Sequence, residues 1–370
     1  MKQRCISKII KIGGFSHVRP VYIGGDNPVV IQTMWKDRLS SEDLKGDTLI
    51  KQIETLDSMG CSLLRFAVPD IESARILGQL AGMVCMPLVA DIHFDYKIAL
   101  ECMDFPIAKL RINPGNIGGK DKVSAVLEKA AAKKIPIRIG VNAGSLPQDL
   151  RLQVEEGMGT APALVQAAER EMAVFKEHNF ENFLVSMKAS GIADTIEASR
   201  IFSQRTDTPL HIGVTEAGPL AAGIAANAAA LCTLLTEGIG DTIRVSLSDT
   251  MENEVIAGRE IIRAASQLYA GNERLKRKGV RIVSCPRCGR HGFDTHGFTA
   301  RWLPRLYCLD KDITVAIMGC EVNGPVEAQH ADLGITGAGD KVLLFKHGKI
   351  IKTITAAAAD TFFEEELNRL

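Results

Sequence analysis

Three features of the sequence predict a (β/α)8 (TIM) barrel followed by a small α+β domain. Short β-branched runs alternate with longer segments of helical apolar spacing from residue 29 to about residue 265, which is the pattern of a parallel sheet. Eight such units fit the ~250 residues that a closed barrel takes. No GxGxxG turn joins a strand to a helix, so an open doubly wound sheet is disfavoured.

The barrel is predicted to occupy residues 1–269. Its strands are predicted at residues 29–34, 63–68, 87–92, 108–113, 136–142, 183–188, 210–216 and 242–246. Three long segments with apolar residues at helical spacing predict barrel helices at residues 161–178, 221–236 and 253–269.

Residues 270–280 are predicted to form a linker, because an Ala-Gly-Asn stop is followed by a charged stretch. The second domain is then expected at 281–370. Its apolar runs predict strands at residues 281–284, 313–318, 341–345 and 350–354, before a terminal amphipathic helix.

The overall composition excludes several classes of protein. The 370 residues include 44 basic and 44 acidic side chains and only 5% aromatic residues, which leaves little for a nucleic-acid surface. No apolar run approaches the ~20 residues of a membrane span. The basic N-terminus is interrupted by lysines before it reaches signal-peptide length. We therefore expect a cytoplasmic protein without nucleic-acid or membrane partners.

The predicted strands end in polar residues, and in a barrel these ends carry the catalytic groups. Five of them are cations, which repel one another unless a multiply charged anion lies between them. Arginine suits phosphate oxygens and asparagine can orient hydroxyls, so a small diphosphate is the expected ligand. The candidates are Gln32, Arg65, Asp91, His93, Arg111, Asn113, Arg138, Asn142, Lys188, Glu216, Arg244 and Ser246.

Two of these strand ends lead into Gly-rich connections, at residues 113–119 and 142–145, which can present backbone N–H groups to phosphate. Glu216, among the cations, is the best-placed proton donor or acceptor, and Asp91 and His93 are the other catalytic candidates. The alternative role for Glu216 is that of an internal partner for Arg244.

Nine cysteines indicate thiols or metal ligands rather than a disulfide framework. We expect the five isolated ones to be buried thiols; these are Cys5, Cys61, Cys85, Cys102 and Cys232. A CxxC pair, Cys285 and Cys288, with Cys320 beside glycine and proline predicts a metal site. The residues leave two metals open: zinc, completed by His291, His296 or Cys308, and an iron-sulfur cluster.

Taken in order, these motifs are distinctive. They are ADIHFD from residue 90, LRINPGNIG from 110, IRIGVNAGSL from 137, KAS from 188, TEAG from 215 and GIGDTIRVS from 238, followed by CPxC and GCxVNGP. Together they closely resemble the two-domain bacterial type of the 4-hydroxy-3-methylbut-2-enyl diphosphate synthase family, over nearly the whole chain.

The resemblance implies a chemistry for each domain. The barrel would bind 2-C-methyl-D-erythritol 2,4-cyclodiphosphate through its arginines and Lys188, with Glu216 as the acid near the departing hydroxyl. The second domain would hold a 4Fe-4S cluster on Cys285, Cys288, Cys320 and the carboxylate of Glu327. Two electrons from ferredoxin or flavodoxin and two protons would open the ring. In the family, one subunit's cluster domain closes on the partner's barrel in a head-to-tail homodimer.

The chain departs from the family pattern in two places. Val326 stands where glycine is usual, so the turn that delivers Glu327 loses freedom. Residues 35–38 after the first strand read Trp-Lys-Asp-Arg in place of a Thr/Asn-rich stretch, so substrate contacts there do not carry over.

Two other functions remain open from the residues. A zinc-stabilised aldolase or lyase acting on a phosphorylated sugar would use Lys188 to form a Schiff base. A non-catalytic diphosphate-binding protein would use its cluster as a redox or iron sensor, although binding alone rarely needs a poised carboxylate such as Glu216.

Overall fold

The computed structural model describes residues 6–269, 271–286, 288–321 and 324–370. The chain forms two compact units, Met1–Lys276 and Arg277–Leu370. Some predicted features lie outside the described residues: the isolated thiol of Cys5, the first residue of the predicted linker, Arg287 within the CxxC pair, and the Val-Asn of GCxVNGP.

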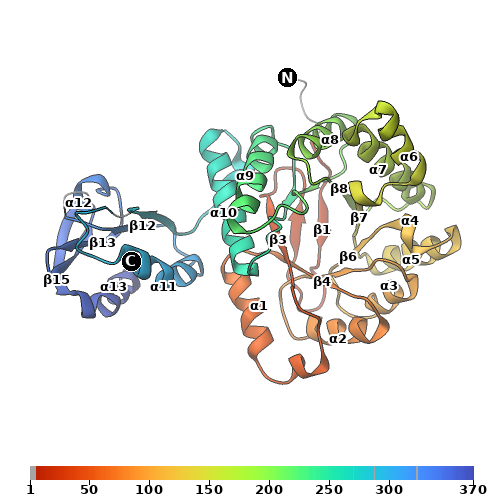
Figure 1. The fold of residues 1–370 in the computed structure, drawn as a ribbon. Coiled ribbons are helices and arrows are strands. Elements are labelled where there is room, and N and C mark those ends of the chain that lie inside the picture. Colours follow the sequence, from red (N-terminus) through yellow and green to blue (C-terminus); the bar gives the residue numbers. More distant parts are fainter. Residues whose placement is uncertain (1–5, 270, 287, 322–323) are drawn as a thin grey trace. The chain divides into compact units, whose positions relative to one another are not determined.

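The first unit contains a barrel of eight parallel strands (Figure 1). Each strand starts within one residue of its predicted position. They are β3 (Val30–Met34), β4 (Leu63–Ala67), β5 (Leu88–Asp91), β6 (Lys109–Ile112), β7 (Ile137–Asn142), β8 (Phe183–Lys188), β9 (His211–Ile212) and β10 (Thr242–Ile243). They run in the order β8-β7-β6-β5-β4-β3-β10-β9, and a parallel bridge from Val185 to Leu210 closes the ring.

Helices follow the strands and surround the barrel (Figure 1). The main ones are α1 (Thr48–Ser58), α2 (Ile71–Ala81), α3 (Tyr96–Cys102), α5 (Lys120–Lys133), α7 (Thr160–Glu177), α8 (Ile192–Arg205), α9 (Leu220–Thr236) and α10 (Met251–Leu268). The three helices predicted from spacing correspond to α7, α9 and α10. No helix in the described parts of the chain has the length and apolarity needed to cross a membrane.

An antiparallel hairpin that the sequence pattern does not predict precedes the barrel. Its strands are β1 (Ile10–Ile12) and β2 (Val21–Ile23). Ile10, Ile12 and Ile23 pack in one apolar cluster with Val30 and Leu63, which begin barrel strands. The hairpin therefore covers the amino-terminal end of the barrel and leaves the carboxyl ends of the strands for a ligand.

The isolated cysteines of the barrel differ in exposure. Cys61 and Cys102 are buried, and burial raises the pKa of each thiol to about 12. Cys232 is partly buried. The prediction was wrong for Cys85, which is exposed because it lies in the turn between α2 and β5 rather than in either element.

The second unit is built on a five-stranded sheet in the order β11-β12-β13-β14-β15. Its strands are β11 (Arg281–Ser284), β12 (Thr314–Met318), β13 (Leu333–Ala338), β14 (Lys341–Lys346) and β15 (Lys349–Thr355). β11, β12 and β13 run parallel to one another, and β14 runs antiparallel to both of its neighbours, β13 and β15. The helices are α11 (Thr295–Tyr307), α12 (Gly324–Glu327) and α13 (Ala359–Asn368).

Aromatic residues fill the core of this unit. The ring centroids of Phe298 and Trp302 of α11 lie 5.1 and 4.8 Å from that of Phe363 of α13, and 5.8 Å from each other. Four predicted strands and the terminal helix are present, whereas β13 and α11 were missed. Glycines at 334 and 337 weaken the strand pattern of β13, and Pro304 interrupts that of α11.

Candidate active site

The register of the barrel strands brings the predicted site residues side by side. Asp91 pairs with Arg111 across β5 and β6, and Arg111 pairs with Arg138 across β6 and β7. Further along, Lys188 of β8 lies opposite Asn142 of β7. Asp91, Asn142 and Lys188 are the last residues of their strands, where barrel enzymes carry their sites. Arg111 lies one residue before the end of β6, and Arg138 lies deeper, at the second position of β7.

Asp91 is the anionic centre of this cluster. Its carboxylate lies 3.1 Å from Nη1 of Arg111, 3.5 Å from Nε of Arg65 and 3.7 Å from Nε2 of His93. Burial alone would raise the pKa of Asp91, but the opposing effects of Arg65, His93, Arg111 and Arg138 outweigh it and lower the pKa. Asp91 therefore stays charged and fixes both arginines.

A cavity of about 220 Å³ opens beside Asp91, between the ends of β4 and β5. His93 and the exposed Phe94 line it together with Ile98 of α3. The predicted catalytic pair Asp91 and His93 thus shares one cavity wall, and Arg111 lies directly behind it.

Three buried cations have no carboxylate among the partners that the structure assigns to them. Arg138 donates to the neutral hydroxyl of Ser186 (2.6 Å), and its Nε and Nη2 are buried without a hydrogen-bond partner. Lys188 is 4% exposed. Burial, followed by neighbouring arginines, lowers the pKa of Arg138 and of Lys188 well below their ordinary values.

Lys109 is the third buried cation, and sequence reasoning missed it. It is fully buried and donates to the amide oxygen of Gln32 at 2.8 Å. Burial, and then the charge of Arg138, lowers its pKa. The signal was available, because Lys109 and Arg111 alternate with apolar residues and so share the inner face of β6.

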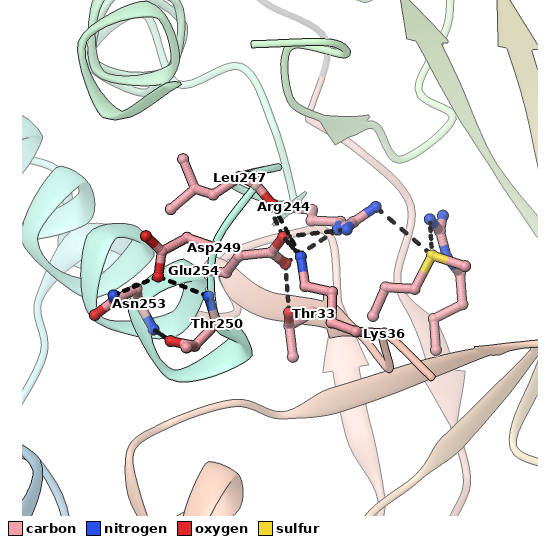
Figure 2. A network of polar contacts seen from close by, with 10 residues as sticks. Thr33, Lys36, Arg244, Leu247, Asp249, Thr250, Asn253 and Glu254 are labelled. Atoms are coloured by element: carbon pink, nitrogen blue, oxygen red, sulfur yellow. Dashed lines mark hydrogen bonds and ion pairs between the residues drawn. The ribbon is translucent and has the colours of Figure 1, made fainter. Parts of the chain in front are cut away.

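Arg244 pairs with Glu254 of α10, so its internal partner is not Glu216 (Figure 2). The guanidinium places Nε 3.3 Å from Oε2 and Nη2 3.2 Å from Oε1 of Glu254. Sequence reasoning missed Glu254. A carboxylate in the first turn of a helix is usually a solvated cap, and only its burial at 1% exposure distinguishes this one.

Glu216 lies beyond the end of its strand. The runs predicted to reach residues 216 and 246 end at Ile212 and Ile243. After β9 the backbone passes very close to the next segment: a Cβ on Gly213 would lie 2.3 Å from the carbonyl oxygen of Arg244. Glu216 itself is exposed and has a φ of 54°, an uncommon value outside glycine that often marks functional positions.

The neutral candidates lie at the starts of the connecting loops. Asn113 directly precedes the short helix α4 (Pro114–Ile117), and Asn142 precedes the helical turn Ala143–Ser145. Asn113, Asn142 and Ser246 are all partly exposed. Their side chains can therefore reach a ligand above the buried cations.

The loop after β3, where the chain departs from the family pattern, is fixed to the barrel. Trp35 stacks on Phe66 with ring centroids 5.6 Å apart. Nζ of Lys36 donates to Oε1 of Glu254 at 2.5 Å and to the carbonyl of Leu247 at 3.0 Å. Lys36 is thus a further cation at the seam between β3 and β10.

The cysteines of the second unit lie near the ends of two parallel strands. Cys285 follows β11 and its N–H donates to the carbonyl of Ile317, which places it beside the end of β12 and hence near Cys320. Cys288 is exposed, and a backbone hydrogen bond at Arg290 lowers its pKa. Glu327 ends the short helix α12 that follows Cys320.

The donor set suits an iron-sulfur cluster in kind and in chain position. Thiolates are the usual cluster ligands, and a hollow of about 460 Å³ beside Cys285 offers space. Within the described residues, no three His, Cys, Asp or Glu side chains converge closely enough to share a metal ion. His296 lines the hollow, whereas Nδ1 of His291 lies 2.7 Å from the carbonyl of Cys288.

Comparisons with known protein families agree with the fold of both units. The family model described as the GcpE TIM-barrel domain matches residues 15–259, and the GcpE protein C-terminal domain matches residues 281–369. Among solved structures, a dihydropteroate synthase from Thermus thermophilus is similar over 70% of this chain and 99% of that chain, with a TM-score of 0.46 and 14% identity.

Curated relatives match almost from end to end, and each is named 4-hydroxy-3-methylbut-2-en-1-yl diphosphate synthase (flavodoxin). The protein of Treponema pallidum (strain Nichols) is 49% identical over 98% of this chain and 92% of its own length. That of Treponema denticola is 46% identical over 99% of both chains. That of Thermodesulfovibrio yellowstonii is 43% identical over the whole of both. The resemblance seen in the motifs is confirmed, and the chain belongs to the GcpE family.

Proposed function

We propose that this protein is a flavodoxin-dependent 4-hydroxy-3-methylbut-2-en-1-yl diphosphate synthase of the methylerythritol phosphate route to isoprenoids. It converts 2-C-methyl-D-erythritol 2,4-cyclodiphosphate to 4-hydroxy-3-methylbut-2-enyl diphosphate by reductive ring opening and dehydroxylation. Two electrons and two protons enter and one water leaves. The name shared by relatives that are 43–49% identical over nearly the whole chain carries this proposal.

The charge balance of the barrel mouth supports a diphosphate substrate. Asp91 and Glu254 hold Arg65, Arg111 and Arg244. Lys109, Arg138 and Lys188 are buried basic groups to which the structure assigns no carboxylate, and burial lowers the pKa of each. A diphosphate supplies the missing negative charge, and arginine forks match its oxygens. In this assignment the arginines and Lys188 bind the diphosphate, and Asn113, Asn142 and Ser246 contact its oxygens or the substrate hydroxyls.

Glu216 is assigned as the acid that protonates the departing hydroxyl. Its side chain is exposed, as a group that exchanges protons with solvent must be. Its positive φ is a conformation that the surrounding structure must enforce. Asp91 and His93 orient Arg111, and His93 borders the cavity between β4 and β5.

The cofactor proposed for the second unit is a 4Fe-4S cluster. Cys285, Cys288 and Cys320 would supply thiolates and Glu327 an oxygen ligand, which is harder and more easily displaced. When bound, such a cluster takes electrons one at a time from a donor protein and delivers them to the substrate. Flavodoxin is the donor in the relatives' names.

The active assembly is proposed to be a head-to-tail homodimer in which the cluster unit of one subunit serves the barrel of its partner. Each chain carries its two candidate sites in separate compact units, as this arrangement requires. Light scattering of the purified protein tests it directly, since a monomer at the concentrations of full activity would contradict it.

The deciding experiment is anaerobic purification with iron and acid-labile sulfide analysis, followed by addition of the cyclodiphosphate with a strong one-electron reductant. About four of each per chain, with product formed, is the expected result. Zinc without sulfide, together with borohydride trapping of a phosphosugar on Lys188, would replace the proposal by the lyase. An intact cluster that binds the cyclodiphosphate without turnover would replace it by the sensor.

A further inference from the structure

Glu254 is surrounded by hydrogen-bond donors at the seam where β3 meets β10 (Figure 2). Thr33 of β3 donates to Oε2 at 2.5 Å, and Lys36 from the following loop donates to Oε1 at 2.5 Å. The backbone N–H of Leu247 donates to Oε1 at 3.1 Å, and Arg244 donates to both oxygens. Segments more than 200 positions apart in the chain thus meet on one carboxylate.

This arrangement requires a carboxylate, because every contact comes from a donor and only an ionised carboxylate is acceptor-only. Burial raises the pKa of Glu254, but Arg244, Lys36 and Thr33 outweigh burial and lower the pKa below its ordinary value. A buried charged group of this kind is a poor source of stability in itself. The way its contacts orient Arg244 is therefore a better guide to its role than its contribution to the free energy of unfolding.

The pairing leaves one edge of the Arg244 guanidinium directed away from Glu254. Nε and Nη2 face the carboxylate, while Nη1 lies 3.7 Å from Sδ of Met34. The same sulfur lies 2.8 Å from Nη2 of Arg65. Glu254 thereby fixes the plane of Arg244 with its remaining donor on the side of Arg65 and the other buried cations.

We propose that Glu254 is a positioning residue for diphosphate binding, which acts by fixing the guanidinium of Arg244, and that Lys36 ties the loop after β3 to the same carboxylate. This inference rests on the proposed function, in which Arg244 binds the diphosphate. Glu254 itself touches neither the substrate nor the reacting atoms.

The sign of the effect separates positioning from simple electrostatics. Glu254 places a negative charge beneath an anion site, so by charge alone its neutralisation should tighten diphosphate binding. Positioning gives the opposite result, because Glu254→Gln turns an N–H₂ group toward donors and releases Arg244. Glu254→Asp separates the two effects further. It keeps the negative charge, but its side chain is one methylene shorter, so the carboxylate no longer reaches Arg244 in the same geometry.

The experiment measures the affinity of the whole protein for the cyclodiphosphate by calorimetry, with Arg244→Met as the second arm of a double-mutant cycle. We expect Glu254→Gln and Glu254→Asp each to weaken binding about tenfold, the size of one lost charge-assisted hydrogen bond. In the Arg244→Met background the same changes should alter affinity by less than about twofold. In turnover, Glu254→Asp should raise KM and leave kcat within about twofold.

The matched control is Asp249→Asn, which removes a carboxylate from the same end of α10. Among the described residues, Asp249 accepts hydrogen bonds from Thr250 and Asn253 and none from Arg244, so its loss should leave the affinity unchanged within about twofold. Lys36→Met should weaken binding less than Glu254→Asp does, because Arg244 retains its partner.

Unchanged or tighter binding in both Glu254 variants would overturn the inference. Equal losses with and without Arg244 would overturn it as well, since Glu254 would then act on the whole fold. If Arg244→Met itself binds normally, the phosphate assignment of the proposed function fails first, and the inference fails with it. Should Glu254→Gln not fold, Glu254→Asp alone completes the cycle.

Discussion

The barrel mouth and the cysteine site of the second unit are organised in opposite ways. At the mouth, Asp91 and Glu254 each hold two or more partners within 3.7 Å, and their surroundings are buried. At the cysteine site, Cys288 is exposed and Cys285 only partly buried, and no three metal-binding side chains converge among the residues described.

The difference follows from what neutralises the charges of each site, which is protein carboxylates at the mouth and a metal at the cysteine site. Three cations of the mouth, Arg65, Arg111 and Arg244, are held by carboxylates of the protein, so their geometry exists before a ligand arrives. Thiolates repel one another. Arg290 lowers the pKa of Cys288, but the described residues do not bring three metal-binding side chains together, so closure of the site must come from the metal itself. Substitutions at the two sites should therefore have different consequences, and the following predictions test that contrast.

The largest effect is expected at the cysteine site. Cys285→Ser should reduce iron from about four atoms per chain to fewer than about one, because the site has no preformed geometry to compensate for a lost thiolate. Turnover should fall by more than about 100-fold. Iron and sulfide analysis after anaerobic reconstitution measures the first, and product formation the second.

Cys308→Ser is the control for this change. Cys308 lies at the carboxyl end of α11, and we expect its replacement to leave iron content unaltered. If Cys308→Ser lost the cluster and Cys285→Ser retained it, the ligand assignment would have to be reversed.

At the barrel mouth, removal of any one cation should weaken diphosphate binding. Its effect on the stability of the protein should depend on whether that cation pairs with a carboxylate. Arg138→Met removes a buried charge without a carboxylate partner, so stability should rise, by about 1–3 kcal/mol. Arg111→Met deprives Asp91 of a hydrogen bond and should lower stability, by about 1–3 kcal/mol. Both should weaken diphosphate binding by about 10- to 100-fold.

Urea unfolding and calorimetric titration of the two variants provide these values, with iron content as the common reference. If both variants lost the same stability, the buried charge of Arg138 would not destabilise the ligand-free protein. A loss of iron with normal binding would refute the anion site.

Lys188 should couple ligand binding to protons. Its pKa in the folded chain lies well below 10.5 because of burial and the neighbouring arginines, so the unfolded chain binds the proton more tightly. The stability from this residue therefore rises as pH increases through the folded pKa and levels off above the ordinary one. A bound diphosphate raises the pKa again, so binding should take up as much as about one proton.

Calorimetry in buffers of different ionisation enthalpy, repeated over a series of pH values below 10.5, measures this uptake. Lys188→Met should abolish it, whereas Lys133→Met on the outer helix α5 should not. Undiminished uptake in Lys188→Met would assign the proton to another group.

The smallest effect is expected at Val326, where the family pattern has glycine. The residue lies within helix α12 and its side chain is 69% exposed, so its backbone does not require glycine. Val326→Gly should change stability by less than about 0.5–1 kcal/mol and activity by less than about twofold. A marked gain in activity would show that the valine restricts the delivery of Glu327.

Local patterns accounted for the barrel strands and for most of the mouth. Each strand is a short apolar run that ends in polar residues, so both its start and its site residue can be read within a few positions. Lys109 belongs to the same pattern. It was missed because it is the first residue of β6, whereas site residues were sought at the strand ends. The amino-terminal hairpin was missed because its strands, only three residues long, lie before the alternation of strands and helices that marked the barrel strands.

What the sequence determined by itself was the order of elements, the cation-rich strand ends and the cysteine motif, because each depends on neighbours in the chain. Only the tertiary structure decided which carboxylate each cation meets. Thr33 and Glu254 are 221 positions apart, and Arg244 found its partner in α10 rather than in Glu216. Barrel closure brings β3 beside β10, and no local spacing encodes a contact that exists only after the ring has closed.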